Sequence, residues 1–266
     1  MQKKSTVGQL ILTEFKSSFE KGECTICEII SDHLERFYSW FVIESYYNPG
    51  MMDELKKAYG FCKEHTWKLI EAGRPYITGV MYEYITHTAE LNLEQFLKEI
   101  RMLGPKRKSL LKREDERKDF KKMTGIFTQR FQCPACKNLA ENERDAVLHF
   151  LMVLKEEGMK DLYVKSKGLC LHHLLQVLSI SKEAEAIFLI EDQIERTQRL
   201  NGELREFLKK FDYGYQNEPE GPEQDSWIRA AKFFVGKRFD PLALIKRLEE
   251  GHSLKATASK GGVRCC

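Results

Sequence analysis

The stretch Cys24-Thr25-Ile26-Cys27 opens a cysteine frame that occurs twice in the chain and decides its fold. In the first copy, Cys62-Lys63-Glu64-His65 follows at a distance. The second copy pairs Cys133-Pro134-Ala135-Cys136 with Cys170-Leu171-His172-His173, offset from the first by 108 or 109 residues. Six of the eight cysteines therefore belong to one repeated scheme.

The spacing within the frame predicts metal binding. Two ligands separated by two residues reach one ion from a single turn, and two such pairs complete a tetrahedral site. Each copy offers three thiolates and one imidazole, a set that suits structural zinc and, as an alternative, an iron–sulfur cluster. We therefore expect two zinc sites, one per copy. The predicted ligands are Cys24, Cys27, Cys62 and His65 in the first copy and Cys133, Cys136, Cys170 and His173 in the second.

Four alternatives to this ligand assignment stay open. One mixed site could form, with the remaining ligands idle or paired differently, or the cysteines could be buried or redox-active thiols. His172 could replace His173, although His173 keeps the C-x-x-H spacing of the first copy. Cys133-Pro134-Ala135-Cys136 also resembles a thioredoxin-like redox motif, which would require a preceding strand within a βαβ unit.

The residues before each C-x-x-H pair also repeat. Gly60 and Gly168 stand two positions before Cys62 and Cys170, where a glycine lets the chain bend sharply beside the thiolate. Phe61 and Leu169 lie between and are expected to act as apolar plugs.

Hydrophobic periodicity predicts an all-α fold. Apolar residues recur at helical spacing over 26–42, 51–59, 62–72 and 77–103, and the second copy repeats this order over 139–154, around 162, 170–180 and 187–211. We expect two homologous helical repeats of about four helices each, followed by C-terminal helices. The expected domains are 1–104 and 125–212 for the repeats, 105–124 for a basic linker, and 213–266 for C-terminal helices and a flexible tail.

Composition limits the class of protein. The 266 residues are 42% hydrophobic and 31% charged, with a net charge of +3, as expected for a globular protein with a sizeable core. No stretch reaches the roughly 20 apolar residues of a membrane helix, and residues 9–19 are too polar for a signal peptide. Without an export signal, eight cysteines indicate thiols or metal ligands in the cytoplasm rather than disulfides.

Features outside the frame are less specific. The linker holds nine basic and four acidic residues between positions 105 and 122, so it predicts a solvated segment and, secondarily, a nucleic-acid contact. His87 has no counterpart in the second copy and is expected to be structural or exposed. The terminal Cys265-Cys266 offers prenylation, reactive thiols or further soft-metal ligands as alternatives.

The motifs Cys133-Pro134-Ala135-Cys136, Gly168-Leu169-Cys170 and Gly60-Phe61-Cys62-Lys63-Glu64-His65 resemble an uncharacterised prokaryotic family. Its members pair C-P-x-C with G-F-C-x-x-H about 35 residues later and often carry a Thr-His further on, to which Thr86-His87 is similar. The resemblance covers about 20–105 and 130–212, and Thr25 departs from the usual proline. It supports the ligand set and implies no reaction.

These observations predict a metal-binding helical protein, with structural zinc, that acts as a binding or scaffold module rather than an enzyme. A protein partner is expected. The alternative function is iron–sulfur electron transfer or redox sensing.

Overall fold

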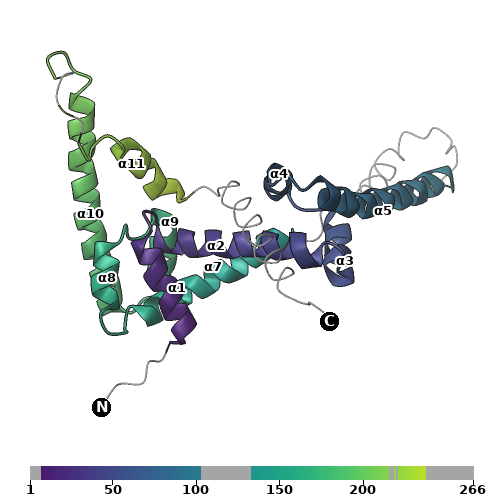
Figure 1. Cartoon of the computed structure of the whole chain (residues 1–266), viewed down its shortest axis with the longest axis horizontal. Coiled ribbons are helices and arrows are strands. Elements are labelled where there is room, and N and C mark those ends of the chain that lie inside the picture. The colour runs from purple at the N-terminus through teal and green to yellow at the C-terminus, as the bar shows by residue number, and fades with distance from the viewer. Residues whose placement is uncertain (1–6, 103–132, 216–218, 220, 238–266) are drawn as a thin grey trace, which may run out of the picture. The chain divides into compact units, whose positions relative to one another are not determined.

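Every regular element in the described part of the chain is a helix (Figure 1). The computed structural model describes residues 7–102, 133–215, 219 and 221–237. Its helices are α1 (Gln9–Glu20), α2 (Thr25–Trp40), α3 (Pro49–Ala58), α4 (Lys63–Glu71), α5 (Pro75–Met102), α7 (Pro134–Val153), α8 (Met159–Lys165), α9 (Leu171–Ile180), α10 (Glu183–Lys209) and α11 (Ser226–Val235). The predicted all-α class is confirmed.

The helices follow the order that the periodicity predicts. Helices α2–α5 cover the first copy of the frame, α7–α10 cover the second, and α11 follows where a further amphipathic helix is expected. Helix α2 continues into a π-helical turn, Phe41–Ser45, which the periodicity does not distinguish from ordinary helix. Helix α1 is additional, and its buried Phe15 and Phe19 are four residues apart, a spacing that could have revealed it.

The chain folds into two compact units, and each combines parts of both copies. The first unit contains the described residues of 1–33 and 140–239, and the second contains those of 34–139. Helix α2 contributes its residues up to His33 to the first unit and its remainder to the second. Helix α7 passes from the second unit to the first at Ala140. The compact units therefore do not coincide with the sequence copies.

The first unit is built around a cluster of aromatic rings. Phe15 and Phe19 of α1 lie 6.2 and 6.0 Å, centroid to centroid, from Phe150 and Tyr163 respectively, and all four side chains are buried. Helix α1 packs on α8, and α11 packs on α9 and α10 (Figure 1). The first residues of α2 and of α9 therefore belong to the same compact unit.

The second unit has its own aromatic core. Phe61, 3% exposed, contacts the rings of Phe37, Tyr38 and Phe41 at centroid distances of 5.2–6.2 Å. Helices α3 and α4 both pack on α5, of which only Met81 and Ile85 are buried. Phe61 is thus the apolar plug that its position before Cys62 predicts.

No helix among the described residues is both long enough and apolar enough to cross a membrane. The predicted basic linker, the last predicted helix from Asp240 and the terminal Cys265-Cys266 lie outside the described residues.

Candidate metal centres

Two clusters of three cysteines and one histidine form in the structure. The first cluster consists of Cys24, Cys27, Cys170 and His173 and lies within the first unit. The His173 Nδ1 atom lies 3.4 Å from the sulfurs of Cys24 and Cys27 and 3.2 Å from that of Cys170. The sulfurs of Cys27 and Cys170 are 3.9 Å apart. Cys24, Cys170 and His173 are buried.

The second cluster consists of Cys62, His65, Cys133 and Cys136 and lies within the second unit. The His65 Nδ1 atom lies 3.2 Å from the Cys62 sulfur, 3.7 Å from that of Cys133 and 3.3 Å from that of Cys136. The sulfurs of Cys62 and Cys136 are 3.6 Å apart. The two clusters therefore have nearly the same internal geometry.

The pairing of the ligands differs from the one expected. We expected each copy of the frame to enclose its own four ligands, but the C-x-x-C pair of one copy meets the C-x-x-H pair of the other. The physical reason is the path of α2 and α7, each of which starts in one unit and ends in the other. Each C-x-x-C pair is thereby carried away from the C-x-x-H pair of its own copy.

All four ligand pairs lie at helix N-termini. Cys62 and Cys170 are the N-cap residues of α4 and α9, with extended ψ angles of 166° and 162°. Cys24 and Cys133 directly precede α2 and α7. Their carbonyl oxygens accept hydrogen bonds of 3.0 Å from the backbone N–H groups four residues later, those of Glu28 and Lys137. The second ligand of each pair follows within the first helical turn. The positive ends of two helix dipoles thus stabilise the thiolates of each cluster.

Glycines shape the loops that lead into the C-x-x-H pairs, as predicted. Gly60 and Gly168 have φ angles of +97° and +77°, which side-chain-bearing residues rarely adopt. The Gly168 carbonyl accepts a hydrogen bond of 3.1 Å from the Thr25 N–H, joining this loop to the start of α2. On α10, Arg196 donates to the carbonyls of Tyr163, Val164 and Ser166 and fixes the same loop. Leu169 is 3% exposed.

The donor atoms fit a single tetrahedral ion. Bonds of about 2.3 Å to sulfur and about 2.0 Å to nitrogen separate two sulfurs by about 3.8 Å and a sulfur from a nitrogen by about 3.5 Å. The measured separations are 3.6 and 3.9 Å between sulfurs and 3.2–3.7 Å between sulfur and nitrogen. A disulfide would require about 2.05 Å between sulfurs, and the six described cysteines are free.

The thiols compete for protons when no cation neutralises them. Hydrogen bonds with Cys170 and Cys24 raise the pKa of Cys27 far above its ordinary value, while hydrogen bonds with Cys24 and Cys27 lower that of Cys170. Burial, aided by the charge of Cys133, raises the pKa of Cys136 to about 12. Three sulfurs held this close favour a shared positive charge, which a divalent ion supplies more completely than protons do.

Glu143 supports the histidine of the first cluster from outside. Its Oε1 atom lies 3.2 Å from the Nε2 atom of His173, whose Nδ1 faces the sulfurs. Hydrogen bonding to His173 is the main cause that lowers the pKa of Glu143 to about 2. Burial by itself would lower the pKa of His173, but the Cys170, Cys24 and Glu143 contacts outweigh it and raise that pKa to about 11. A carboxylate on the outer nitrogen is the usual partner of a metal-binding histidine.

The second cluster lacks this carboxylate. The position equivalent to Glu143, 109 residues earlier, is Leu34. Burial and the neighbouring Lys68 charge lower the pKa of His65 to about 4, which keeps its imidazole neutral as a metal ligand requires. Glu143 could not be singled out from the sequence, since the acidic residue has no counterpart at the equivalent position of the repeat.

The end of α11 approaches the first cluster closely. A Cβ atom on Gly236 would lie 3.0 Å from the Cys27 sulfur and 3.7 Å from that of Cys170. The backbone of Lys237 hydrogen-bonds to Cys27, and its ammonium group pairs with Glu28 at 2.8 Å. This contact could not be predicted from the sequence, because α11 lies outside the repeated frame.

The remaining histidines lie elsewhere. His87 is exposed on α5, 3.6 Å from Glu90. His172 is exposed and lies 3.0 Å from Glu143, so it does not enter the first cluster. The thioredoxin-like hypothesis for the second C-x-x-C pair requires a βαβ unit, and the described residues contain no strand; residues 127–131, directly before the pair, lie outside them.

A family model described as "Family of unknown function (DUF6062)" matches residues 9–241, a range that covers both copies of the frame. No curated protein and no solved structure matches the chain.

Proposed function

Because the chain belongs to this family of unknown function, we propose its role from the geometry: it is a helical binding or scaffold module whose two Cys3His clusters each bind one structural zinc ion. The observation that carries the proposal is the crossed assembly of two complete tetrahedral ligand sets. Each set joins two helix starts that are distant in sequence, as a structural metal site does.

The ligand count favours a structural role over a catalytic one. A catalytic zinc ion keeps an open position for water or substrate, whereas four protein ligands close the coordination sphere. Structural zinc contributes about 10–16 kcal/mol in small zinc-dependent domains at pH 7, against a typical total stability of about 5–15 kcal/mol. Loss of the ion would therefore unfold the surroundings of each cluster.

A single ion explains the clusters better than an iron–sulfur centre. All four donor atoms of each cluster lie within 4.8 Å of one another. Iron–sulfur clusters place two or more irons and bridging sulfides between their ligands, which forces thiolates on different irons further apart. Clusters of reduced thiols also require a reducing compartment, so we expect the protein in the cytoplasm.

The binding or scaffold part of the proposal is supported by exposed apolar side chains. Tyr76, Leu91 and Leu93 of α5 are 73, 52 and 55% exposed, and Ile187, Ile190 and Ile194 of α10 are 43–51% exposed. The three isoleucines are spaced three and four residues apart and therefore share one face of α10, and a contiguous exposed apolar stripe is typical of a surface that meets a protein partner.

Elemental analysis with an absorbance spectrum, on protein purified without oxygen, tests the proposal. We expect about two zinc ions per chain and no visible colour. Iron with acid-labile sulfide would contradict the structural-zinc proposal and support the iron–sulfur alternative. Protein that is folded and free of metal would overturn it.

A further inference from the structure

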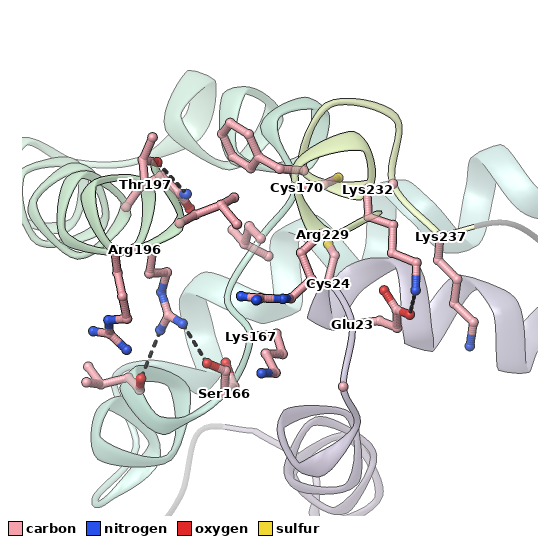
Figure 2. A pocket seen from close by; sticks show the side chains of 18 of the residues that line it. Glu23, Cys24, Ser166, Lys167, Cys170, Arg196, Thr197, Arg229, Lys232 and Lys237 are labelled. Carbon is pink, nitrogen blue, oxygen red and sulfur yellow. Dashed lines mark hydrogen bonds and ion pairs between the residues drawn. The ribbon is translucent and has the colours of Figure 1, made fainter. Parts of the chain in front are cut away.

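A cavity of about 350 Å³ adjoins the first cluster (Figure 2). Its walls come from the loop before α2, the loop between α8 and α9, the middle of α10 and the end of α11, all within the first unit. Cys24 and Cys170 form part of its edge. The volume lies at the lower end of the range of small-molecule sites.

The wall of the cavity is strongly basic. Its lining residues include seven lysines or arginines and two glutamates. Five of the basic side chains are held in ion pairs: Arg196 with Asp192, Arg199 with Glu195, Arg229 with Glu203, Lys232 with Glu23 and Lys237 with Glu28. These pairs fix the wall and leave little charge for a ligand.

Two lysines remain available. Lys165, the last residue of α8, and Lys167, in the loop that follows it, are exposed and have no acidic partner in the described ranges of the chain. Figure 2 shows Lys167 beside the same open space as Arg196 and Arg229. The backbone of this loop is anchored by Arg196, so the two ammonium groups project from a rigid support.

The cavity also holds an unused polar group. The Oε1 atom of Gln193, a residue only 9% exposed, has no hydrogen-bond partner, while its Nε2 donates to the Thr197 hydroxyl at 3.3 Å. A buried acceptor without a partner is costly, and a donor group on a ligand would satisfy it. Leu200 and Phe233 add apolar surface to the wall.

We propose that this cavity binds a small organic anion with a phosphate or carboxylate head group. Lys165 and Lys167 bind the head group, Gln193 accepts a hydrogen bond from a hydroxyl or amino group of the ligand, and Leu200 and Phe233 contact its apolar part. A concave wall with two uncompensated ammonium groups concentrates small anions. The proposal stands on the shape and charge of the cavity and does not depend on which metal the clusters hold.

Lysine labelling with pyridoxal 5′-phosphate tests this proposal. The reagent is itself a small phosphorylated anion, and its aldehyde condenses with an amine to an imine and water; borohydride then reduces the imine to a stable secondary amine that mass spectrometry locates. Lys160, exposed on α8 and outside this cavity, is the matched control. We expect Lys165 or Lys167 to react about tenfold or more faster than Lys160, since a basic cleft raises the local anion concentration by at least that factor.

Protection experiments on the full chain identify the head group. Slower labelling of Lys165 or Lys167 in the presence of inorganic phosphate indicates a phosphate head, and slower labelling with citrate alone indicates a carboxylate. In the K165Q/K167Q variant, the circular dichroism spectrum and metal content should be unchanged. Labelling of the two other lysines that line the cavity, Lys232 and Lys237, should be lost. Equal rates at all three lysines, or protection by a single-stranded oligonucleotide but by neither small anion, would overturn the proposal.

Discussion

At the scale of single residues, the two clusters differ outside their ligands. His173 has the Glu143 carboxylate 3.2 Å from its outer nitrogen, whereas the position equivalent to Glu143 is Leu34. The carboxylate fixes the orientation of the imidazole and strengthens it as a donor. We therefore expect the first cluster to hold its ion more tightly than the second.

The Glu143→Ala substitution tests this role. It should weaken metal retention at the first cluster by about 10–100-fold, because the histidine loses its outer hydrogen bond. The measurement is the rate at which a chelator removes zinc, followed with a chromogenic indicator. Glu141→Ala, an exposed change on the same helix, is the control and should leave that rate unchanged. Equal rates in the two variants would contradict the role of Glu143.

At the scale of the element, α11 is an addition to the repeated frame that covers one cluster. It ends at Gly236, whose φ of +74° side-chain-bearing residues rarely adopt, and where a Cβ atom would be in tight contact with the Cys27 sulfur at 3.0 Å. The ion pairs of Lys232 with Glu23 and Lys237 with Glu28 fasten the same end of the helix. Among the described helices, α11 thus helps to shield the first cluster from water.

Gly236→Ala should disturb this cover. The backbone of Gly236, with φ +74° and ψ −166°, is essentially restricted to glycine and costs another residue about 1–3 kcal/mol, so zinc should leave the first cluster about tenfold faster. Gly202→Ala in α10 is the matched control, since its Cβ would meet no atom within 4 Å. Chelator kinetics should show one accelerated phase and one unchanged phase. Acceleration of both phases would show that α11 does not act on the first cluster alone.

At the scale of the whole molecule, the crossed pairing makes each copy of the frame incomplete by itself. Each copy supplies a C-x-x-C pair to one cluster and a C-x-x-H pair to the other. His33 and Asn142, which occupy the same position in the two copies, hydrogen-bond at 2.6 Å within the first unit.

Paired cysteine substitutions distinguish the crossed arrangement from separate copies. A Cys24→Ser, Cys170→Ser variant removes two ligands from one cluster and should retain about one zinc ion per chain under chelator competition. A Cys24→Ser, Cys62→Ser variant removes one ligand from each cluster and should retain neither ion. If each copy enclosed its own ligands, the two variants would exchange these results. Metal content after gel filtration gives the answer.

Much of the fold and of the ligand set could be predicted from the sequence, because both depend on local patterns. The 3.6-residue period located α2–α5 and α7–α11, and the spacing of Cys62 and His65 identified a ligand pair. The pairing could not be predicted, since the crossed and uncrossed arrangements use the same local spacings. Glu143 and Gly236 escaped prediction because tertiary packing alone brings them to the first cluster.

If the clusters bind zinc as proposed, the crossed ligand sets have a consequence for synthesis on the ribosome. Cys24 and His173 are 149 residues apart, which at roughly 5–20 residues per second corresponds to about 7–30 s of translation. Cys62 and His65 emerge much earlier, only 35 residues after Cys27 in the case of Cys62. A nascent chain that meets zinc in this interval can therefore close a non-native site within one copy. Correct folding then requires the ion to be released and recaptured once the second copy has left the exit tunnel.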